Sequence, residues 1–443
     1  MSDGAPMRRR RSNGPPSVRH GRLHKRRPYA TVAKVLVATL GVLIVSGGSI
    51  AAIAAWDVAR TIKPGVHLAL PPGKTAVPIP SVGAIDGGVN LLLTGTDTRT
   101  GQGGAFSTAD ELSGSSGAGN NDVTMLLHIA QNHQSALVVS FPRDMMIPIP
   151  ECPNPNGGTY YAVDKGMMNS TLSRGGLSCV VLTIEKLTGV SIPFAAEVSF
   201  DGVSAMSNAV GGVTVCLASP VVDKYTNPPL DLAAGQQTLV GPQALSFLRS
   251  RHGVGDGSDL GRISNQQVFL SALARKIVAG GVLANPFQLY PLAKAAAQNM
   301  TLSDTLTNPT TMVQIALALK NTGLDKMAFI QYPVVTDPDN VNRVIPQTSS
   351  AEVLNNALVN DQPVQLTGTT GRAAEVAPGT STATPTPTTT AAPSTPGATT
   401  PGATTAPAPS TSTPPTSGPA PVVLPSDITG QLAITQTCTK GNG

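Results

Sequence analysis

The sequence contains few aromatic residues, few cysteines and little charge in its central part. Phe, Trp and Tyr make up 3% of its 443 residues, so a core must consist mainly of Val, Ile, Leu, Ala and Met. The formal net charge is +5, but residues 1–30 hold nine Arg and Lys and one Asp, which leaves −3 for the rest. A slightly acidic globular part argues against binding of nucleic-acid phosphates across its surface.

Charge is absent from one long apolar run, residues 35–56. As a helix this run would be about 33 Å long, enough for a bilayer core of about 30 Å. The basic residues before it predict a cytoplasmic segment at 1–34 and an external position for the chain after Trp56. A cleaved signal peptide is the alternative, although the run and its basic flank are long for one. We predict a single transmembrane helix at 35–56, placing the protein in the cell membrane.

The four cysteines, Cys152, Cys179, Cys216 and Cys438, all follow this run, on the side where disulfides persist. No two of them have the short spacing of a zinc site. Cys152 and Cys179 lie in loop-like stretches rich in Gly and Pro, which favours their pairing. Cys216 is either a buried free thiol or the partner of Cys438.

The rest of the chain divides by composition. Residues 57–88 contain PG, PPG and PIP and are typical of an extracytoplasmic linker. From 89 to 370, apolar strand patterns alternate with helical ones, such as those at 178–189, 201–212 and 261–280, which predicts a three-layer α/β domain. Residues 371–443 are mostly Pro, Thr, Ala and Ser, and predict a disordered low-complexity tail that is either O-glycosylated or an unmodified spacer.

Acidic residues stand at the ends of two predicted strands. Asp97 follows the first apolar strand, and Asp122 begins the next one after a loop rich in Gly and Ser. Two carboxylates at one edge of a sheet suit a hard cation such as Mg²⁺, with Mn²⁺ as a substitute. The alternative is that each caps a turn.

Arginines are concentrated near the predicted strand ends. Arg143 follows a strand, and the Gly-rich segment 247–266 holds Arg249, Arg251 and Arg262, with Asp259 placed to hold one of them. Gln266 is four residues after Arg262 and shares its helical face. Guanidinium groups match phosphate oxygens, whereas a solvated basic loop would show no preference for Arg. For Arg143 the alternative is a pair with Asp144 or another carboxylate. The four arginines carry four positive charges, against two negative charges on Asp97 and Asp122. The two carboxylates would repel a pyrophosphate, and a bound Mg²⁺ would remove that repulsion.

Taken together and in this order, residues 95–99, 121–122, 141–144, 211–213 and 249–266 resemble the LytR–CpsA–Psr family. The resemblance implies an α/β/α domain with a mixed central sheet and an apolar sleeve for a polyprenyl chain. It also implies Mg²⁺-dependent transfer of a phosphate-linked glycan from polyprenyl pyrophosphate to the muramic-acid 6-hydroxyl of peptidoglycan.

The resemblance also assigns roles to individual residues. It implies Mg²⁺ ligation by Asp97 and Asp122, pyrophosphate binding and catalysis by Arg143, Arg249, Arg251 and Arg262, and substrate contacts by Arg99, Asp259 and Gln266. Two departures stand out: Asn265 replaces an Arg that the family often has, and Met167 and Met168 replace the usual Lys-Ile before Asn. A Pro/Thr stalk stands where many relatives have a small C-terminal domain.

These inferences predict a cell-wall polymer ligase, a phosphotransferase anchored in the membrane with its catalytic domain outside. Its partners would be the lipid-linked glycan donor, peptidoglycan and the membrane, and no nucleic acid. The Ala-, Pro- and Thr-rich composition indicates a high-GC genome and favours an arabinogalactan-type polymer. The alternatives are a non-catalytic lipid-binding, wall-binding or regulatory protein, and a polyprenyl-pyrophosphate hydrolase.

Overall fold

The structure, a computed structural model, describes residues 28–71, 88–98, 119–282, 285–378 and 420–442. The chain divides into two compact units, Met1–Ala54 and Ala55–Gly443. Helix α1 (Pro28–Thr61) begins in the first unit and ends in the second. Among the described residues, no helix reaches the length and apolarity needed to cross a membrane. The transmembrane helix at 35–56 therefore stays a prediction, and most of the predicted basic segment lies outside the described residues.

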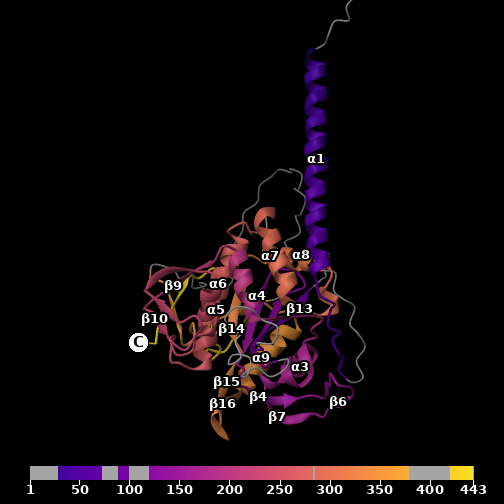
Figure 1. Cartoon of the computed structure of the whole chain (residues 1–443). Coiled ribbons are helices and arrows are strands. Elements are labelled where there is room, and N and C mark those ends of the chain that lie inside the picture. Colours follow the sequence, from indigo (N-terminus) through magenta and orange to yellow (C-terminus); the bar gives the residue numbers. More distant parts are fainter. Residues whose placement is uncertain (1–27, 72–87, 99–118, 283–284, 379–419, 443) are drawn as a thin grey trace, which may run out of the picture. The chain divides into compact units, whose positions relative to one another are not determined.

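The second unit is built on a mixed sheet of seven strands (Figure 1). Their order is β13 (Met300–Leu302), β8 (Phe194–Val198), β1 (Val89–Thr96), β2 (Asn121–Ile129), β3 (Ala136–Phe141), β14 (Met327–Gln331) and β20 (Gly430–Leu432). β1 runs parallel to β8 and β3 parallel to β14, while the other neighbouring pairs are antiparallel. The mixed sheet expected from the sequence is confirmed.

Helices cover both faces of this sheet. They are α3 (Ser170–Thr188), α4 (Phe200–Ala209), α5 (Pro242–Arg249), α6 (Asp259–Val278), α7 (Pro286–Asn299), α8 (Pro309–Thr322) and α9 (Thr348–Val359), with a short 3₁₀ turn at Asp304–Leu306. Side chains alternate in direction along a strand, so Leu92 and Leu126 point to the layer of α3 and α9. Phe194 and Phe329 point to the opposite layer, where α8 and part of α6 pack. Strands that are apolar on both faces require this three-layer arrangement.

A second sheet of four strands lies beside the first. Its order is β12 (Gly235–Leu239), β9 (Val213–Leu217), β21 (Thr437–Thr439) and β18 (Ala374–Val376). Phe247 of α5 and Phe269 of α6 belong to its core. The remaining strands form pairs: β4 (Met146–Ile149) with β7 (Val163–Met167), β5 (Cys152–Pro153) with β6 (Thr159–Tyr160), β10 (Val221–Asp223) with β11 (Leu230–Leu232), β15 (Val334–Asp337) with β16 (Asn340–Pro346), and β17 (Val364–Gln365) with β19 (Val422–Val423).

The C-terminal boundary of the folded domain differs from the predicted one. Residues 374–376 form β18, and residues 420–442, which composition assigned to the tail, supply β19, β20 and β21. β20 pairs with β14 in the central sheet and β21 with β9 in the second. The boundary at residue 370 was therefore too early, because apolar residues such as Ile428 and Ala433 return to the core. The Pro/Thr-rich stretch at 379–419 lies outside the described residues.

Both disulfides are present. Cys152 is bonded to Cys179, as predicted, and Cys216 to Cys438, which settles the alternative left open for Cys216. The second bond joins β9 to β21 and so fastens the C-terminal segment to the domain. Most of the 57–88 segment that was predicted as a linker, from 72 to 87, lies outside the described residues.

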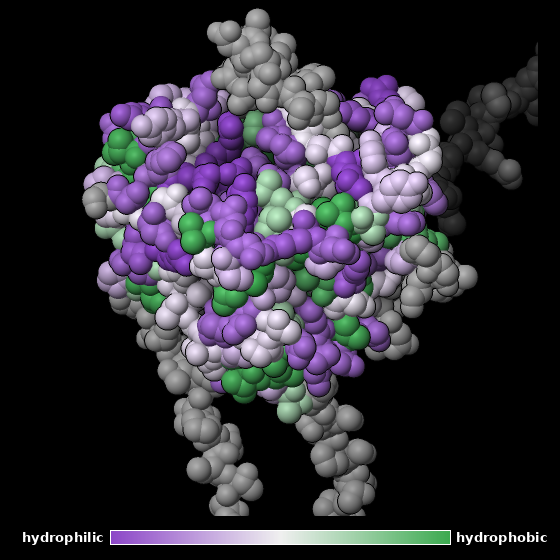
Figure 2. Space-filling model, turned by 90° about the horizontal axis from the view of Figure 1, so that it is seen from below, coloured by the Kyte–Doolittle hydropathy of each residue, from purple (hydrophilic) through white to green (hydrophobic). Residues whose placement is uncertain are grey.

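The surface is mixed in character. Figure 2 shows the side of the molecule that faces down in Figure 1, where hydrophilic residues predominate and hydrophobic ones form small separate groups. Large continuous apolar patches mark interaction sites, and this face has none among the residues drawn in colour. The apolar surface that bears on function is internal and is described below.

Candidate active site

Asp122 is the extra residue of a β-bulge between β1 and β2. Gly95 pairs with Val123 and Thr96 pairs with Asn121, so Asp122 has no partner across this strand pair. A bulge turns a side chain out of the regular alternation and often lies beside an active site. The bulge therefore gives Asp122 a direction that an unbroken ladder would not.

Asn121 fixes this bulge to α3. It is fully buried, and its Oδ1 accepts hydrogen bonds from Leu172 N and Thr171 Oγ1, both at 3.1 Å. Its Nδ2 donates to Thr124 Oγ1 at 2.9 Å. Leu172 N is one of the unpaired donors in the first turn of a helix. The side chain of Asn121 thus satisfies the first turn of α3, which begins at Ser170. A kink at Gly175 and Gly176 separates this turn from the rest of the helix, which lies where the sequence predicted one from residue 178.

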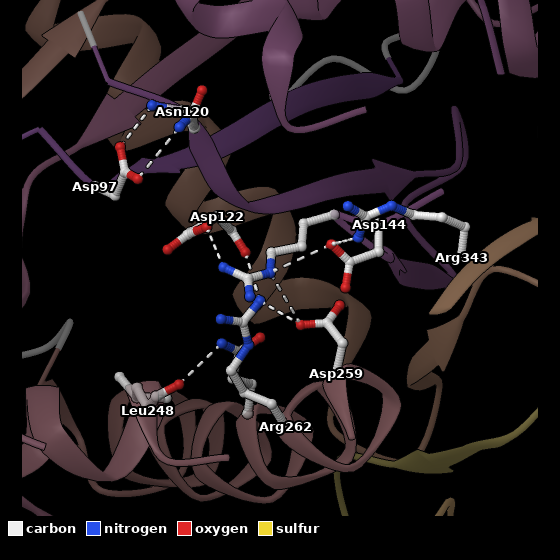
Figure 3. A network of polar contacts seen from close by, with 10 residues as sticks. Asp97, Asn120, Asp122, Asp144, Leu248, Asp259, Arg262 and Arg343 are labelled. Atoms are coloured by element: carbon white, nitrogen blue, oxygen red, sulfur yellow. Dashed lines mark hydrogen bonds and ion pairs between the residues drawn. The ribbon is translucent and has the colours of Figure 1, made fainter. Parts of the chain in front are cut away.

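Asp97 is held beside the start of β2. Its Oδ1 accepts from Asn120 N at 2.5 Å, and its own N–H donates to Asn120 O at 3.1 Å. Gly119 has φ +74°, and a Cβ there would lie 2.7 Å from Asp97 Oδ1, so only glycine fits. Asp97 and Asp122 therefore lie at the same end of neighbouring strands (Figure 3). Arg99 lies outside the described residues.

Two arginines join these acidic residues to α6. Arg143 Nη1 donates to Asp122 Oδ1 at 2.6 Å, and its Nε lies 3.5 Å from Asp259 Oδ1. Arg262 Nη2 lies 2.6 Å from Asp259 Oδ1 and donates to the main-chain oxygen of Asp122 at 2.9 Å. Asp259 is in the first turn of α6, whose N-cap is Ser258. Figure 3 shows Asp259 and Arg262 projecting from α6 toward Asp122.

Burial and charge act in opposite directions on the two arginines. Burial acts to lower the pKa of Arg143, but the carboxylates of Asp122, Asp259 and Asp144 outweigh it and the pKa is raised. Arg262 is only 5% exposed, and burial lowers its pKa although Asp259 acts against that shift. Both remain charged, because a guanidinium group is not deprotonated in proteins. Arg262 thus carries a positive charge in an almost water-free position.

Arg343 extends the network and was not predicted. Its Nη1 donates to Asp144 Oδ1 at 3.2 Å, and the Nε of Arg143 lies 3.8 Å from the same oxygen (Figure 3). Arg343 belongs to β16, in the hairpin of β15 and β16. No local pattern around residue 343 marks it, because only the tertiary fold brings this hairpin to Asp144.

The segment at 167–169, where the sequence departs from the family pattern, supports Arg143 through the main chain. Asn169 N donates to Arg143 O at 3.0 Å, and Met168 N donates to Met145 O at 2.9 Å. The side chain of Met168 is fully buried. The Met-Met pair that stands in place of the usual Lys-Ile therefore makes main-chain contacts to Met145 and, through Asn169, to Arg143.

The remaining predicted residues come from α5, α6 and the loop between them. Arg249 ends α5, with its Cζ 4.1 Å from the ring centre of Phe200. The charge of Arg251 is one of the groups that lower the pKa of Arg262. Gln266 Nε2 donates to Leu248 O at 3.0 Å. The structure therefore gathers every predicted site residue that it describes around the ends of β1, β2 and α5 and the start of α6.

An elongated apolar cavity opens from this polar cluster. It has a volume of about 330 Å³. Its walls come from β1, β2, α4, α5, α6 and α7, and include Leu93, Met125, Val203, Met206, Phe269, Leu273, Ile277 and Leu292. Asp122, Arg249, Arg262 and Gln266 line the same cavity. Arg262 and Ile277 are 15 residues apart on α6, so the cavity extends about 22 Å along that helix at about 1.5 Å per residue.

The polar cluster contains buried charged groups with atoms that lack hydrogen-bond partners within the part of the chain that the structure describes. Among the described residues, buried side-chain atoms that lack a hydrogen-bond partner include Nε of Arg143, Arg251 and Arg262. Both carboxylate oxygens of Asp259 are also in this group, although Oδ1 lies within ion-pair distance of Arg143 and Arg262. Unsatisfied buried polar groups are costly, and phosphate oxygens are strong acceptors for guanidinium. The cluster thus suits an anion with several oxygens.

The carboxylates of Asp97 and Asp122 are the candidate metal ligands. Within the described parts of the chain, no three His, Cys, Asp or Glu residues cluster as a metal-binding group. Mg²⁺ typically takes one or two carboxylates and completes its shell with water and phosphate oxygens. Asp97 and Asp122 fit that requirement, since they place two carboxylates at the same end of neighbouring strands. Arg143 binds Oδ1 of Asp122.

Comparison with known proteins agrees with these features. The LytR_cpsA_psr family matches residues 73–360. The cell wall biosynthesis protein LcpA of Corynebacterium glutamicum is 30% identical over 272 residues, covering 57% of this chain and 51% of LcpA. The probable cell wall biosynthesis protein LcpB of the same organism is 33% identical over 217 residues, 49% of each chain. The chain thus spans about half the length of these two relatives.

More distant relatives include the polyisoprenyl-teichoic acid–peptidoglycan teichoic acid transferase TagT of Bacillus subtilis, 27% identical over 265 residues, covering 58% of this chain and 74% of TagT. Among solved structures, a LytR-Csp2A-Psr enzyme from Actinomyces oris is 22% identical with a TM-score of 0.47, covering 67% of this chain and 96% of that one. Because the family match includes well over half of the chain, this protein belongs to the LytR_cpsA_psr family.

Proposed function

We propose that this protein is an extracytoplasmic phosphotransferase that moves a phosphate-linked glycan from polyprenyl pyrophosphate to the muramic-acid 6-hydroxyl of peptidoglycan. The observation that carries the proposal is the continuity of the apolar cavity with the arginine cluster. A ligand that fills both must have a long apolar chain and an anionic head. A polyprenyl pyrophosphate has these two parts in this order.

The relatives support the class of reaction. The names of LcpA and LcpB refer to cell wall biosynthesis, and that of TagT to transfer of a polyisoprenyl-linked polymer to peptidoglycan. For this chain we propose the same kind of donor and acceptor, with an arabinogalactan-type polymer as the transferred glycan.

In the proposed reaction the sugar hydroxyl attacks the phosphorus that bears the glycan. A new bond forms between that phosphorus and the hydroxyl oxygen, and the bond to the bridging oxygen breaks, so that polyprenyl phosphate leaves. The proton of the hydroxyl passes to a base that we do not assign. Arg143, Arg249, Arg251 and Arg262 would hold the phosphates and balance the charge that collects on the leaving group. Asp259 keeps Arg262 and Arg143 in place.

Asp97 and Asp122 would hold Mg²⁺, for which Mn²⁺ could substitute. When bound, the cation acts as a Lewis acid on the pyrophosphate and offsets its repulsion by the carboxylates. Arg143 contacts Asp122 directly. Its guanidinium therefore orients the carboxylate that we assign to the metal.

We also propose that residues 35–56 anchor the protein in the cell membrane with the N-terminus in the cytoplasm. The support is the charge-free run of 22 residues and the basic residues before it. An anchored enzyme can reach a donor held in the membrane and an acceptor in the wall.

One assay tests the proposal. The full chain is purified in detergent and incubated with labelled glycan–pyrophosphoryl–polyprenol and peptidoglycan, with and without Mg²⁺. We expect label on the peptidoglycan only with Mg²⁺, and a loss of at least about 100-fold in Arg249→Ala and Asp122→Ala. Arg372→Ala is the matched control, because Arg372 is half-exposed and pairs with Asp256 on the surface.

The alternatives give different products in the same assay. A pyrophosphate hydrolase releases free phosphoglycan, and a lipid-binding or wall-binding protein binds the donor without turnover. If Arg249→Ala and Asp122→Ala transfer label as fast as Arg372→Ala does, the assignment of the site is wrong.

A further inference from the structure

We infer that the last residues of the chain, 437–442, are a positioning element for the arginine cluster. This inference rests on the proposed function only in that the cluster is taken to bind phosphates. The segment is joined to the domain by the Cys216–Cys438 disulfide and by the pairing of β21 with β9 and β18. It contains no residue that lines the cavity. Its effect on the site must therefore pass through the residues that it contacts.

The first set of contacts is with the loop between α5 and α6. Gly255 N donates to Lys440 O at 2.9 Å, and Asn442 N donates to Gly253 O at 3.0 Å. Val254, fully buried, forms an antiparallel bridge with Gly441. This loop carries Arg251 and leads into Asp259, so its path decides where both side chains lie. The C-terminal residues thus supply hydrogen-bond partners for main-chain groups of the loop.

The second contact passes through Asn265, one residue before Gln266. Thr439 Oγ1 donates to Asn265 Oδ1 at 2.8 Å, and Asn265 Nδ2 donates to Phe247 O at 2.8 Å. Thr439 and Asn265 are both fully buried. The amide of Asn265 thus links β21 to α6 and to the last turns of α5, where Arg249 lies.

This geometry explains the departure of Asn265 from the family pattern. Its side chain takes no part in lining the cavity, whereas Arg262 and Gln266 do line it. An amide has both a donor and an acceptor, and both are used here, one toward Phe247 and one toward Thr439. Asn265 therefore acts on the site through position and does not itself contact the anion.

The body of α6 is held by residues 431–435, which lead into this segment. Gln431 Nε2 donates to Gln267 O and Ser271 Oγ, both at 2.9 Å. Arg275 Nη1 donates to Ala433 O at 2.7 Å and to Thr435 O at 3.2 Å. Contacts at residues 265, 267, 271 and 275 cover most of the helix. The C-terminal segment thus sets the position of α6 along the cavity as well as that of the loop before it.

The chain offers a matched set of substitutions. Thr439→Val keeps the shape of the side chain and removes the donor to Asn265. Thr439→Ser restores the hydroxyl. Thr437→Val makes the same change two residues earlier in β21, where the buried hydroxyl of Thr437 lacks a hydrogen-bond partner among the described residues. Loss of core packing alone would affect the two Val variants alike.

The full chain and these three variants are compared in the glycan-transfer assay, well below the melting temperature of each. We expect kcat/KM of Thr439→Val to fall about tenfold, the factor to which about 1.4 kcal/mol corresponds, while Thr439→Ser and Thr437→Val stay within about twofold of the parent. Equal losses in Thr439→Val and Thr437→Val, or no loss in Thr439→Val, would overturn the inference.

Amide hydrogen exchange tests the inference without reference to the reaction. We expect the amides of residues 250–258 to exchange faster in Thr439→Val than in Thr439→Ser or Thr437→Val, because the loop loses support. Unchanged exchange in this loop would overturn the positioning role. If the parent chain transfers no glycan while the loop responds as expected, the proposed function fails and the positioning role stands.

Discussion

Neutralising Asp259 should destabilise the protein more than any other isosteric change in the polar cluster. Its Oδ1 lies 2.6 Å from Arg262 Nη2 and 3.5 Å from Arg143 Nε. Opposite unit charges about 4 Å apart attract by about 4 kcal/mol at an effective dielectric constant near 20. Asn in place of Asp259 leaves two buried guanidinium groups without that counter-charge. Removal of one partner of a buried pair costs about 3–5 kcal/mol, which is the loss that we expect for Asp259→Asn.

The measurement is the free energy of unfolding in urea for the full chain in detergent. Asp256→Asn is the control. Asp256 lies in the loop just before Asp259 and pairs with Arg372, but the two side chains are 43% and 54% exposed. Exposed pairs contribute about 0–1 kcal/mol, so this variant should differ from the parent by no more than that. The comparison separates burial from the mere presence of an ion pair.

A ligand provides the second part of the test. Inorganic pyrophosphate should raise the unfolding midpoint of Asp259→Asn more than that of the parent chain, because it supplies negative charge to Arg143 and Arg262. If Asp259→Asn unfolds at the same urea concentration as Asp256→Asn, the buried network does not stabilise the fold as argued. If pyrophosphate shifts both equally, the arginines do not face the anion.

Three further predictions concern other parts of the molecule. Burial raises the pKa of Glu197 above its ordinary 4.5, opposed by Lys63. The wild-type side chain therefore stabilises the fold below about pH 4.5 and loses that contribution as pH rises through the folded pKa. Glu197→Gln should melt higher than wild type at neutral pH and no higher at pH 4, and parallel curves would contradict this. Cys438→Ala should destabilise the protein more than Cys179→Ala, because the two disulfides span 222 and 27 residues. The chain-entropy treatment gives losses of about 5 and about 3.5 kcal/mol. Urea midpoints in the reverse order would refute this prediction. Met206→Trp should fill the cavity and raise KM for a long-chain donor, with little effect on a short-chain analogue, and an equal effect on both donors would argue against a lipid sleeve.

The strands that were predicted correctly are those whose burial is visible locally. The apolar run at 89–95 became β1, with Leu92 on one face and Leu91 and Leu93 on the other. The helix predicted at 178–189 is the part of α3 that follows the kink at Gly175 and Gly176. The turn before the kink was not predicted, because Asn121, a residue in a distant strand, satisfies it. A local pattern cannot contain a cap that comes from about fifty residues away.

The second sheet and the C-terminal segment were missed for a related reason. β20 and β21 are three residues each, too short to show a period of two against the Pro/Thr-rich composition before them. Their identity as strands comes from pairing with β14 and β9. The disulfide from Cys216 to Cys438 was the one hint of this return in the sequence.

The sequence by itself determined the buried strands of the central sheet, the charge-free run at 35–56, and the acidic and arginine residues of the candidate site. These depend on side-chain type and spacing within about twenty residues. Only the tertiary structure decided that Asp122 sits in a bulge, that Arg343 joins the network, and that residues 437–442 support the arginine loop. Each of these depends on contacts between groups that lie far apart in the sequence. Neither of the two segments alone shows a pattern from which the free energy of such a contact could be predicted.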